Sequence, residues 1–125
     1  MNLVWECILP LKLVSEANSS EHWTKKSKRH QNQKKWIKLV YLRDRPILPK
    51  GKTVILLSRI APRSLDADDN LPMSFKYVKD YIADLLRPGL AAGRADDDKN
   101  LTWSYSQETG KPREYAVKIQ IFEVT

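Results

Sequence analysis

The chain has 125 residues, 42% of them hydrophobic and 30% charged, and its formal net charge is +7. This length and composition suit one globular domain with a real core and exclude an intrinsically disordered chain. The single cysteine, Cys7, excludes an intrachain disulfide, and no apolar run approaches the roughly 18 residues of a membrane helix, so we expect a cytoplasmic protein with no membrane partner.

The first part of the chain predicts a strand followed by a helix. Residues 3–14 are mostly apolar, and Pro10 indicates a bend or an edge position within that strand. The polar residues 18–20 can accept hydrogen bonds from free helix N–H groups, so we expect a helix to begin there and to end near Arg43. Its second half has apolar side chains at helical spacing, whereas residues 24–35 are almost entirely polar and leave a loop open as an alternative.

The rest of the chain predicts a strand, a helix and two further strands. Residues 53–60 form a short apolar run rich in β-branched side chains, which is typical of a buried strand. Residues 71–86 place apolar side chains on one helical face. Two strands at 101–107 and 113–124, with a glycine and a proline between them, predict a C-terminal β-hairpin. We therefore expect a single α/β (α+β) domain over residues 1–125, with a mixed sheet and two main helices.

The positive charges gather in one segment. Residues 22–52 carry half of the 22 basic side chains and a single acid, Asp44. Between residues 65 and 98 the sign reverses, since eight of the 15 acids lie there. A protein that needs charge only for solubility usually intersperses the two signs. The segregation therefore favours a basic segment that binds phosphates and acidic clusters that bind cations.

Two acidic clusters flank the predicted helix at residues 71–86. The first consists of Asp66, Asp68 and Asp69, and the second of residues 96–98. The intervening chain is long enough to bring the second cluster back beside the first. Converging carboxylates suit Mg²⁺ or Mn²⁺, which serve phosphodiester hydrolysis by activating water and neutralising charge. The alternative is that the first cluster caps the helix and the second is a solvated turn.

These acidic motifs resemble those of the RusA-type Holliday-junction resolvases and related phage proteins. The resemblance lies in residues 65–71 (LDADDNL), a following helix with Lys76 and Lys79, and the aspartates at 96–98. The polar loop with Asn18 and the basic run after it are similar as well. The resemblance implies a homodimeric, Mg²⁺-dependent endonuclease that cuts four-way DNA junctions in recombination and repair.

The resemblance also implies roles for individual residues. It makes Lys76 a catalytic residue, although the family's helix lysine falls near Met73 here. One more residue separates Leu65 from Asn70 than the family motif has, so the pairing of the aspartates stays open. The implied metal ligands are Asp66, Asp68, Asp69, Asp97 and Asp98, and all of these except Asp68 belong to the catalytic set as well.

The basic segment gives the expected DNA contacts, which would hold phosphates without reading base sequence. A second hypothesis is a non-catalytic, basic DNA- or RNA-binding dimer whose acidic loops are structural. Trp103 and Tyr105 alternate with polar residues, which indicates one sheet face that is core or dimer interface. The expected DNA-binding residues are Asn18, Lys25, Lys26, Lys28, Arg29, Lys34, Lys35 and Lys79.

Overall fold

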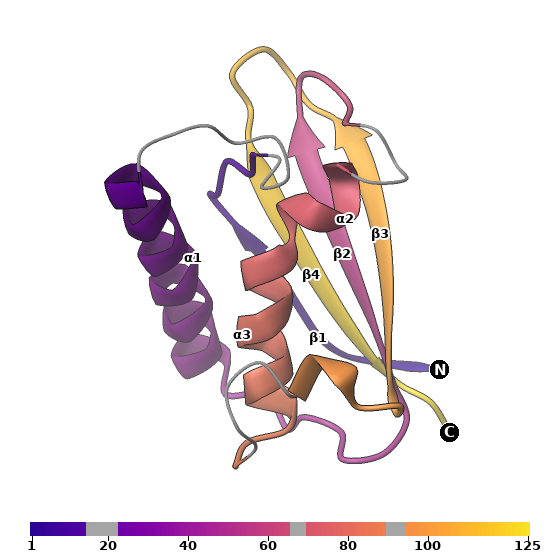
Figure 1. Cartoon of the computed structure of the whole chain (residues 1–125). Helices are drawn as coiled ribbons and strands as arrows, with labels where there is room; N and C mark the ends of the chain where they lie inside the picture. The colour runs from indigo at the N-terminus through magenta and orange to yellow at the C-terminus, as the bar shows by residue number, and fades with distance from the viewer. Residues whose placement is uncertain (15–22, 66–69, 90–94) are drawn as a thin grey trace.

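A computed structural model describes residues 1–14, 23–65, 70–89 and 95–125 of the chain (Figure 1). The element order confirms the predicted mixed α and β class. In chain order the elements are β1 (Asn2–Leu9), α1 (Trp23–Asp44), β2 (Thr53–Ala61), α2 (Asn70–Ser74), α3 (Lys76–Leu86), the 3-10 helix η2 (Ala95–Asp97), β3 (Leu101–Thr109) and β4 (Ala116–Glu123).

The strands form one mixed sheet in the order β1-β4-β2-β3. Strand β4 is antiparallel to both β1 and β2, and β3 is parallel to β2. The predicted C-terminal hairpin is therefore wrong, because β2 lies between β3 and β4. The connection after β3 crosses the end of β2, where the Gly110 amide donates to the Ala61 carbonyl at 2.9 Å. The apolar strand β2 lies inside the sheet with a strand on each side. Its burial there outweighs the turn signal between β3 and β4, which would have made those two strands neighbours.

Both long helices pack on the same face of the sheet (Figure 1). Alternate side chains of the strands point into this layer, and their apolar members are fully or almost fully buried. The helices contribute the apolar residues of one face each. The main core residues are Trp5, Cys7, Leu9, Ile37, Val40, Ile55, Leu57, Val78, Ile82, Val117, Ile119 and Ile121.

Helix α1 includes the polar half for which a loop was the alternative. That half is held by α3: the Tyr81 hydroxyl donates to the His30 carbonyl at 3.3 Å, and the His30 and Tyr77 rings lie with centroids 3.4 Å apart. Contacts with α3 therefore stabilise this half of α1.

The other end of α1 is bound to β1. The Trp5 indole donates to the Asp44 carboxylate at 2.9 Å, and the Arg43 guanidinium donates to the same carboxylate at 2.7 Å. The Arg43 guanidinium, followed by the Trp5 indole, lowers the pKa of Asp44 to about 2. Asp44, the single acid of the basic segment, is therefore ionised, and its carboxylate attaches the last turn of α1 to the sheet.

The helix predicted at residues 71–86 is two helices that meet at Phe75. The Phe75 amide bonds to the Pro72 carbonyl at 3.1 Å, and Ser74 Oγ donates to the Leu71 carbonyl at 2.7 Å. Phe75 is fully buried, and its ring lies 5.7 Å from the Tyr105 ring of β3. Packing of this aromatic side chain against the edge strand accompanies the change of helix axis.

The side chains of Trp103 and Tyr105 pack against the core on the helix-covered face, which confirms the core interpretation. Cys7 is buried in β1, and burial raises the pKa of its thiol to about 12. Within the described ranges, no helix is long and apolar enough to cross a membrane.

Candidate functional site

Some of the predicted site residues lie outside the residues that the structure describes, namely Asn18, Asp66, Asp68 and Asp69. The residues on either side of the first acidic cluster, Leu65 and Asn70, are described. We call the end of the sheet at Ala61 and Thr109 the upper end, and the end at Thr53 and Leu101 the lower end (Figure 1).

Gln107 of β3 holds the chain immediately before the first acidic cluster. The Leu65 amide donates to Gln107 Oε1 at 2.8 Å, and Gln107 Nε2 donates to the Leu65 carbonyl at 2.7 Å. On the other side of the cluster, Leu71 is buried in the core. The chain therefore leaves and rejoins the described fold at the upper end of the sheet, where Gln107 pairs in register with Arg59 of β2.

Arg59 lies on the helix-covered face of β2, and only 7% of its surface is exposed. Its Nη1 donates to the Arg63 carbonyl at 2.7 Å, whereas its Nε is buried and has no hydrogen-bond acceptor. Burial lowers the pKa of the Arg59 guanidinium, which still carries its charge at neutral pH. No carboxylate in the described part of the chain forms an ion pair with this cation.

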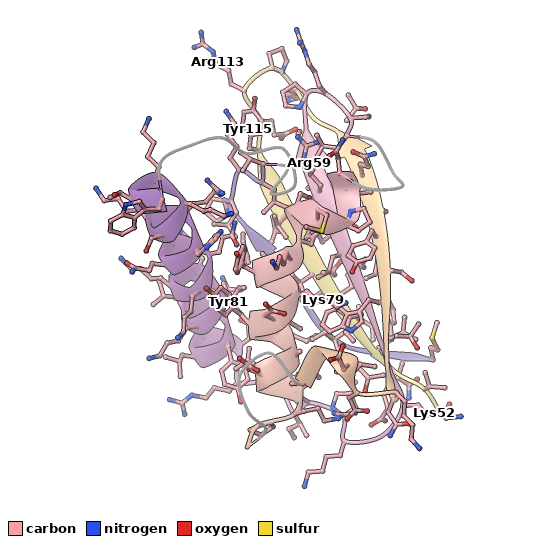
Figure 2. The ribbon with its side chains drawn as sticks, in the orientation of Figure 1. Lys52, Arg59, Lys79, Tyr81, Arg113 and Tyr115 are labelled. Atoms are coloured by element: carbon pink, nitrogen blue, oxygen red, sulfur yellow. The ribbon has the colours of Figure 1, made fainter. Side chains whose placement is uncertain are left out.

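Two further polar side chains lie near Arg59 at the upper end. Tyr115 precedes β4 by one residue, and Figure 2 shows it beside Arg59. Lys12, which follows β1, places its Nζ 4.6 Å from the centre of the Tyr115 ring. The upper end thus combines the described flanks of an acidic segment with a buried arginine and a lysine.

The second acidic cluster lies at the lower end, and one of its members is bound to an arginine. Asp98 Oδ2 accepts a hydrogen bond from Arg87 Nε at 3.1 Å, and Asp98 Oδ1 accepts from the Asn100 amide at 2.8 Å. The Asn100 amide, and after it the Arg87 guanidinium, lower the pKa of Asp98. Asp97 is exposed. Asp98 therefore helps to close the turn before β3, and Asp97 presents its carboxylate to solvent.

The flanks of the two acidic clusters are far apart in one protomer. The Asp98 carbonyl accepts from the Leu101 amide, and Leu65 is held by Gln107. Gln107 lies six positions after Leu101 in β3, which is about 20 Å of strand. Whether the second cluster returns beside Asp66, Asp68 and Asp69, as the chain length permits, lies outside the described residues. Among the described residues, no group of three His, Cys, Asp or Glu side chains could hold a metal ion.

The two helix lysines have different surroundings. Lys76, the first residue of α3, is exposed, and its Nζ lies 5.4 Å from the Tyr77 ring centre. Lys79 is half-buried and points toward β3 (Figure 2), where its Nζ lies 5.4 Å from the Trp103 ring centre. Lys76 is the more accessible of the two to a phosphate, whereas Lys79 covers an indole at the edge of the sheet.

Helix α1 carries most of the predicted DNA-binding side chains. Its 22 residues make a helix about 33 Å long. Asp44 at its last residue is the only acid in it. A basic helix of this length presents charge over several phosphates of a DNA backbone. The exposed basic residues are Lys25, Lys28, Lys34, Lys35, Lys38 and Arg43, and Lys26 and Arg29 are half-buried.

A groove of about 350 Å³ lies between α1 and α3. Its lining is mostly apolar and includes Ile37, Tyr41 and Leu85. Figure 2 shows Tyr81 between the two helices, and Asp84 is the only acid that lines the groove. The side chains that line the groove offer too few ligand atoms for a metal ion, so the groove does not belong to the predicted active site.

Neither a scan against models of protein families nor a search of curated protein sequences matches this chain to a known protein. The functional argument therefore depends on the residues themselves. Sequence reasoning did not identify three of the polar residues that organise the two ends of the sheet: Arg59, Arg87 and Gln107. A signal existed for Arg59, because it is the only charged residue in the apolar run 53–62 and lies at an inward-facing position.

Proposed function

We propose that the chain is a Mg²⁺-dependent, structure-selective DNA endonuclease that cuts four-way junctions. The observation that supports this best is at the upper end of the sheet. There Gln107 pairs in register with the buried cation Arg59 and holds Leu65, the residue before the acidic segment 66–69. Phosphodiester hydrolysis needs both kinds of charge: acids to bind a divalent cation and cations to bind the phosphate.

Asp66, Asp68 and Asp69 would bind the metal ion. Their oxygens are hard ligands, which match Mg²⁺ or Mn²⁺ better than softer metals. When bound, the ion would lower the pKa of a water molecule and neutralise charge on the phosphate. Lys76, which is exposed at the start of α3, would contact a phosphate of the same strand.

A site that uses both acidic clusters would lie between two copies of the chain. Gln107, which holds Leu65, and Leu101 lie about 20 Å apart along β3, and this separation favours a site shared between two protomers. Asp97 from a second copy would reach the acidic segment of the first, and the reciprocal pair would form a second site. Two symmetric sites suit a four-way junction, which requires two cuts, and this favours the predicted homodimer.

The basic side chains of α1 would bind the DNA arms through phosphates. Each lysine–phosphate contact releases counterions, so affinity for the junction should fall steeply with salt. Contacts of this kind position the DNA without reading its sequence. Selectivity for a junction would then come from the spacing of the two copies of α1.

The alternative function is a basic DNA- or RNA-binding dimer without catalysis. The specific observation in its favour is that Asp98 is already bound by Arg87 and the Asn100 amide. The acidic residues at the lower end would then stabilise a turn.

The test is cleavage of a labelled four-way junction and of linear duplex, with Mg²⁺ and with EDTA. We expect paired nicks that need both the junction and Mg²⁺. Asp97→Asn should abolish cleavage and preserve or strengthen binding, because a negative charge near the phosphate is removed. Asp84→Asn, an exposed acid on α3, is the matched control and should cleave normally. Binding without cleavage under every metal tested would refute the endonuclease and leave the binding dimer.

A further inference from the structure

Arg59 is a buried cation whose hydrogen-bonding capacity is mostly unused. Its single hydrogen bond within the described residues joins Nη1 to the Arg63 carbonyl. Among the residues that the structure describes, the buried Nε has no acceptor. Buried polar groups are nearly always paired, and an unpaired one calls for an explanation such as a missing ligand.

The unpaired part of Arg59 has the shape of an oxyanion site. In a guanidinium, Nε and Nη2 form one edge with two parallel N–H bonds, which matches two oxygens of a phosphate or carboxylate. Nη1, the nitrogen already bonded to Arg63, lies outside that edge. The bond to Arg63 therefore fixes the guanidinium through Nη1, and no described residue accepts a hydrogen bond from Nε on the other edge.

The neighbouring side chains add positive charge. Tyr115 lies beside Arg59 (Figure 2), and Lys12 Nζ lies 4.6 Å from the centre of the Tyr115 ring. Lys12 is exposed. The lysine would attract an anion from solvent, and the arginine would bind it at close range in a medium of lower dielectric constant.

We propose that Arg59 is a phosphate-binding residue, whose Nε–Nη2 edge binds two oxygens of a DNA backbone phosphate at the upper end of the sheet, with Lys12 as the second cation. The identity of this phosphate as DNA rests on the proposed function, whereas the oxyanion site itself does not. The competing interpretation is that a carboxylate of the segment 66–69 takes the same edge.

The direct test is NMR of arginine Nε–Hε groups in the ¹⁵N-labelled full chain, titrated with inorganic phosphate at constant ionic strength. The Arg59 signal, identified by its loss in Arg59→Lys, should shift in a saturable manner. The Arg87 signal should not respond, because Arg87 Nε already donates to Asp98. Lys12→Gln should weaken phosphate binding severalfold, whereas Lys52→Gln at the opposite end of the sheet (Figure 2) should not.

Two results would overturn the proposal. One is an Arg59 signal that responds no more than those of exposed arginines. The other is an Arg59 signal that moves on Asp→Asn substitution at 66, 68 or 69 but not with phosphate, which would assign the edge to the chain's own carboxylate. Both results are read from the signal of an intact Arg59 side chain, so neither requires that Arg59→Lys bind phosphate or cleave DNA.

Cleavage assays separate this proposal from the endonuclease proposal. If both hold, Arg59→Lys should lower the rate of junction cleavage at least about tenfold, as expected for loss of a group that contacts the reacting phosphate. Saturable phosphate binding in a protein that never cleaves would support the site and refute the endonuclease. Normal cleavage by Arg59→Lys, with no phosphate response at Arg59, would refute the site and keep the endonuclease.

Discussion

The two ends of the sheet each contain a largely buried arginine, and the two arginines differ in how many of their donors are used. At the lower end, Arg87 donates to Asp98 Oδ2 at 3.1 Å and to the carbonyls of Pro49, Leu86 and Gly51 at 3.0, 2.9 and 2.7 Å. At the upper end, Arg59 donates to one carbonyl of the described chain, and its buried Nε has no acceptor there.

We therefore interpret Arg87 as a structural arginine and Arg59 as an arginine that can bind a ligand. Arg87 connects the end of α3, the segment before β2 and the turn before β3, and its charge is balanced by Asp98. Arg59 connects its own strand only to the nearby Arg63 carbonyl. A buried charge that is balanced stabilises a fold, whereas an unbalanced one costs stability and is retained where a function needs it.

The largest expected effect is at Arg87. Arg87→Met should lower the free energy of unfolding by about 2–4 kcal/mol, because three carbonyls and a carboxylate lose their donor. Urea denaturation of the full chain measures this change. Arg63→Met, at an exposed side chain, is the control and should change stability by less than about 0.5 kcal/mol. Equal effects of the two substitutions would contradict the structural role of Arg87.

The second effect is at Gln107. Gln107→Met keeps the side-chain volume but removes both hydrogen bonds to Leu65, so the free energy of unfolding should fall by about 1–2 kcal/mol. Under the proposed function, junction cleavage should fall as well, since the acidic segment loses its anchor. Gln120→Met is the matched control, because Gln120 Nε2 bonds to the exposed Glu6 at 3.0 Å on the other face. A larger loss from the control would contradict the anchoring role.

A smaller effect, which depends on pH, is expected at Asp98. The folded state lowers the pKa of Asp98, so the stabilisation is fully present above its ordinary pKa of about 3.9 and is lost as the pH falls through the lower folded value. Asp98→Asn should therefore reduce stability at pH 7, and the difference from the native chain should shrink below about pH 4. Thermal unfolding between pH 7 and 2 tests this. Asp97→Asn, at an exposed side chain, should leave stability at pH 7 unchanged.

The smallest effect on stability is expected at Arg59. Arg59→Met removes one hydrogen bond together with an unbalanced buried charge, so the free energy of unfolding should change by less than about 1 kcal/mol in either direction. Urea denaturation beside Arg87→Met gives the direct comparison. A loss as large as that of Arg87→Met would show that Arg59 has an intramolecular partner, and the contrast between the two ends would disappear.

Much of the secondary structure follows from local patterns. Apolar runs located the strands at the start and centre of the chain, and the apolar face of residues 71–86 is the buried face of α2 and α3. The break at Phe75 could not be predicted, because it accompanies packing of a buried ring against Tyr105 of β3. The hairpin prediction failed for a similar reason. A turn between two strands does not specify whether a third strand lies between them.

The sequence by itself determined the class of the fold, the apolar core positions and the separation of a basic segment from acidic segments. These depend on side-chain periodicity and charge, which are local properties of the chain. Only the tertiary structure decided that the flanks of the two acidic clusters lie at opposite ends of β3, that Arg87 is balanced and that Arg59 is not. The parallel pairing of β2 and β3 is the physical reason, since it places the end of one strand and the start of the next at opposite ends of one sheet.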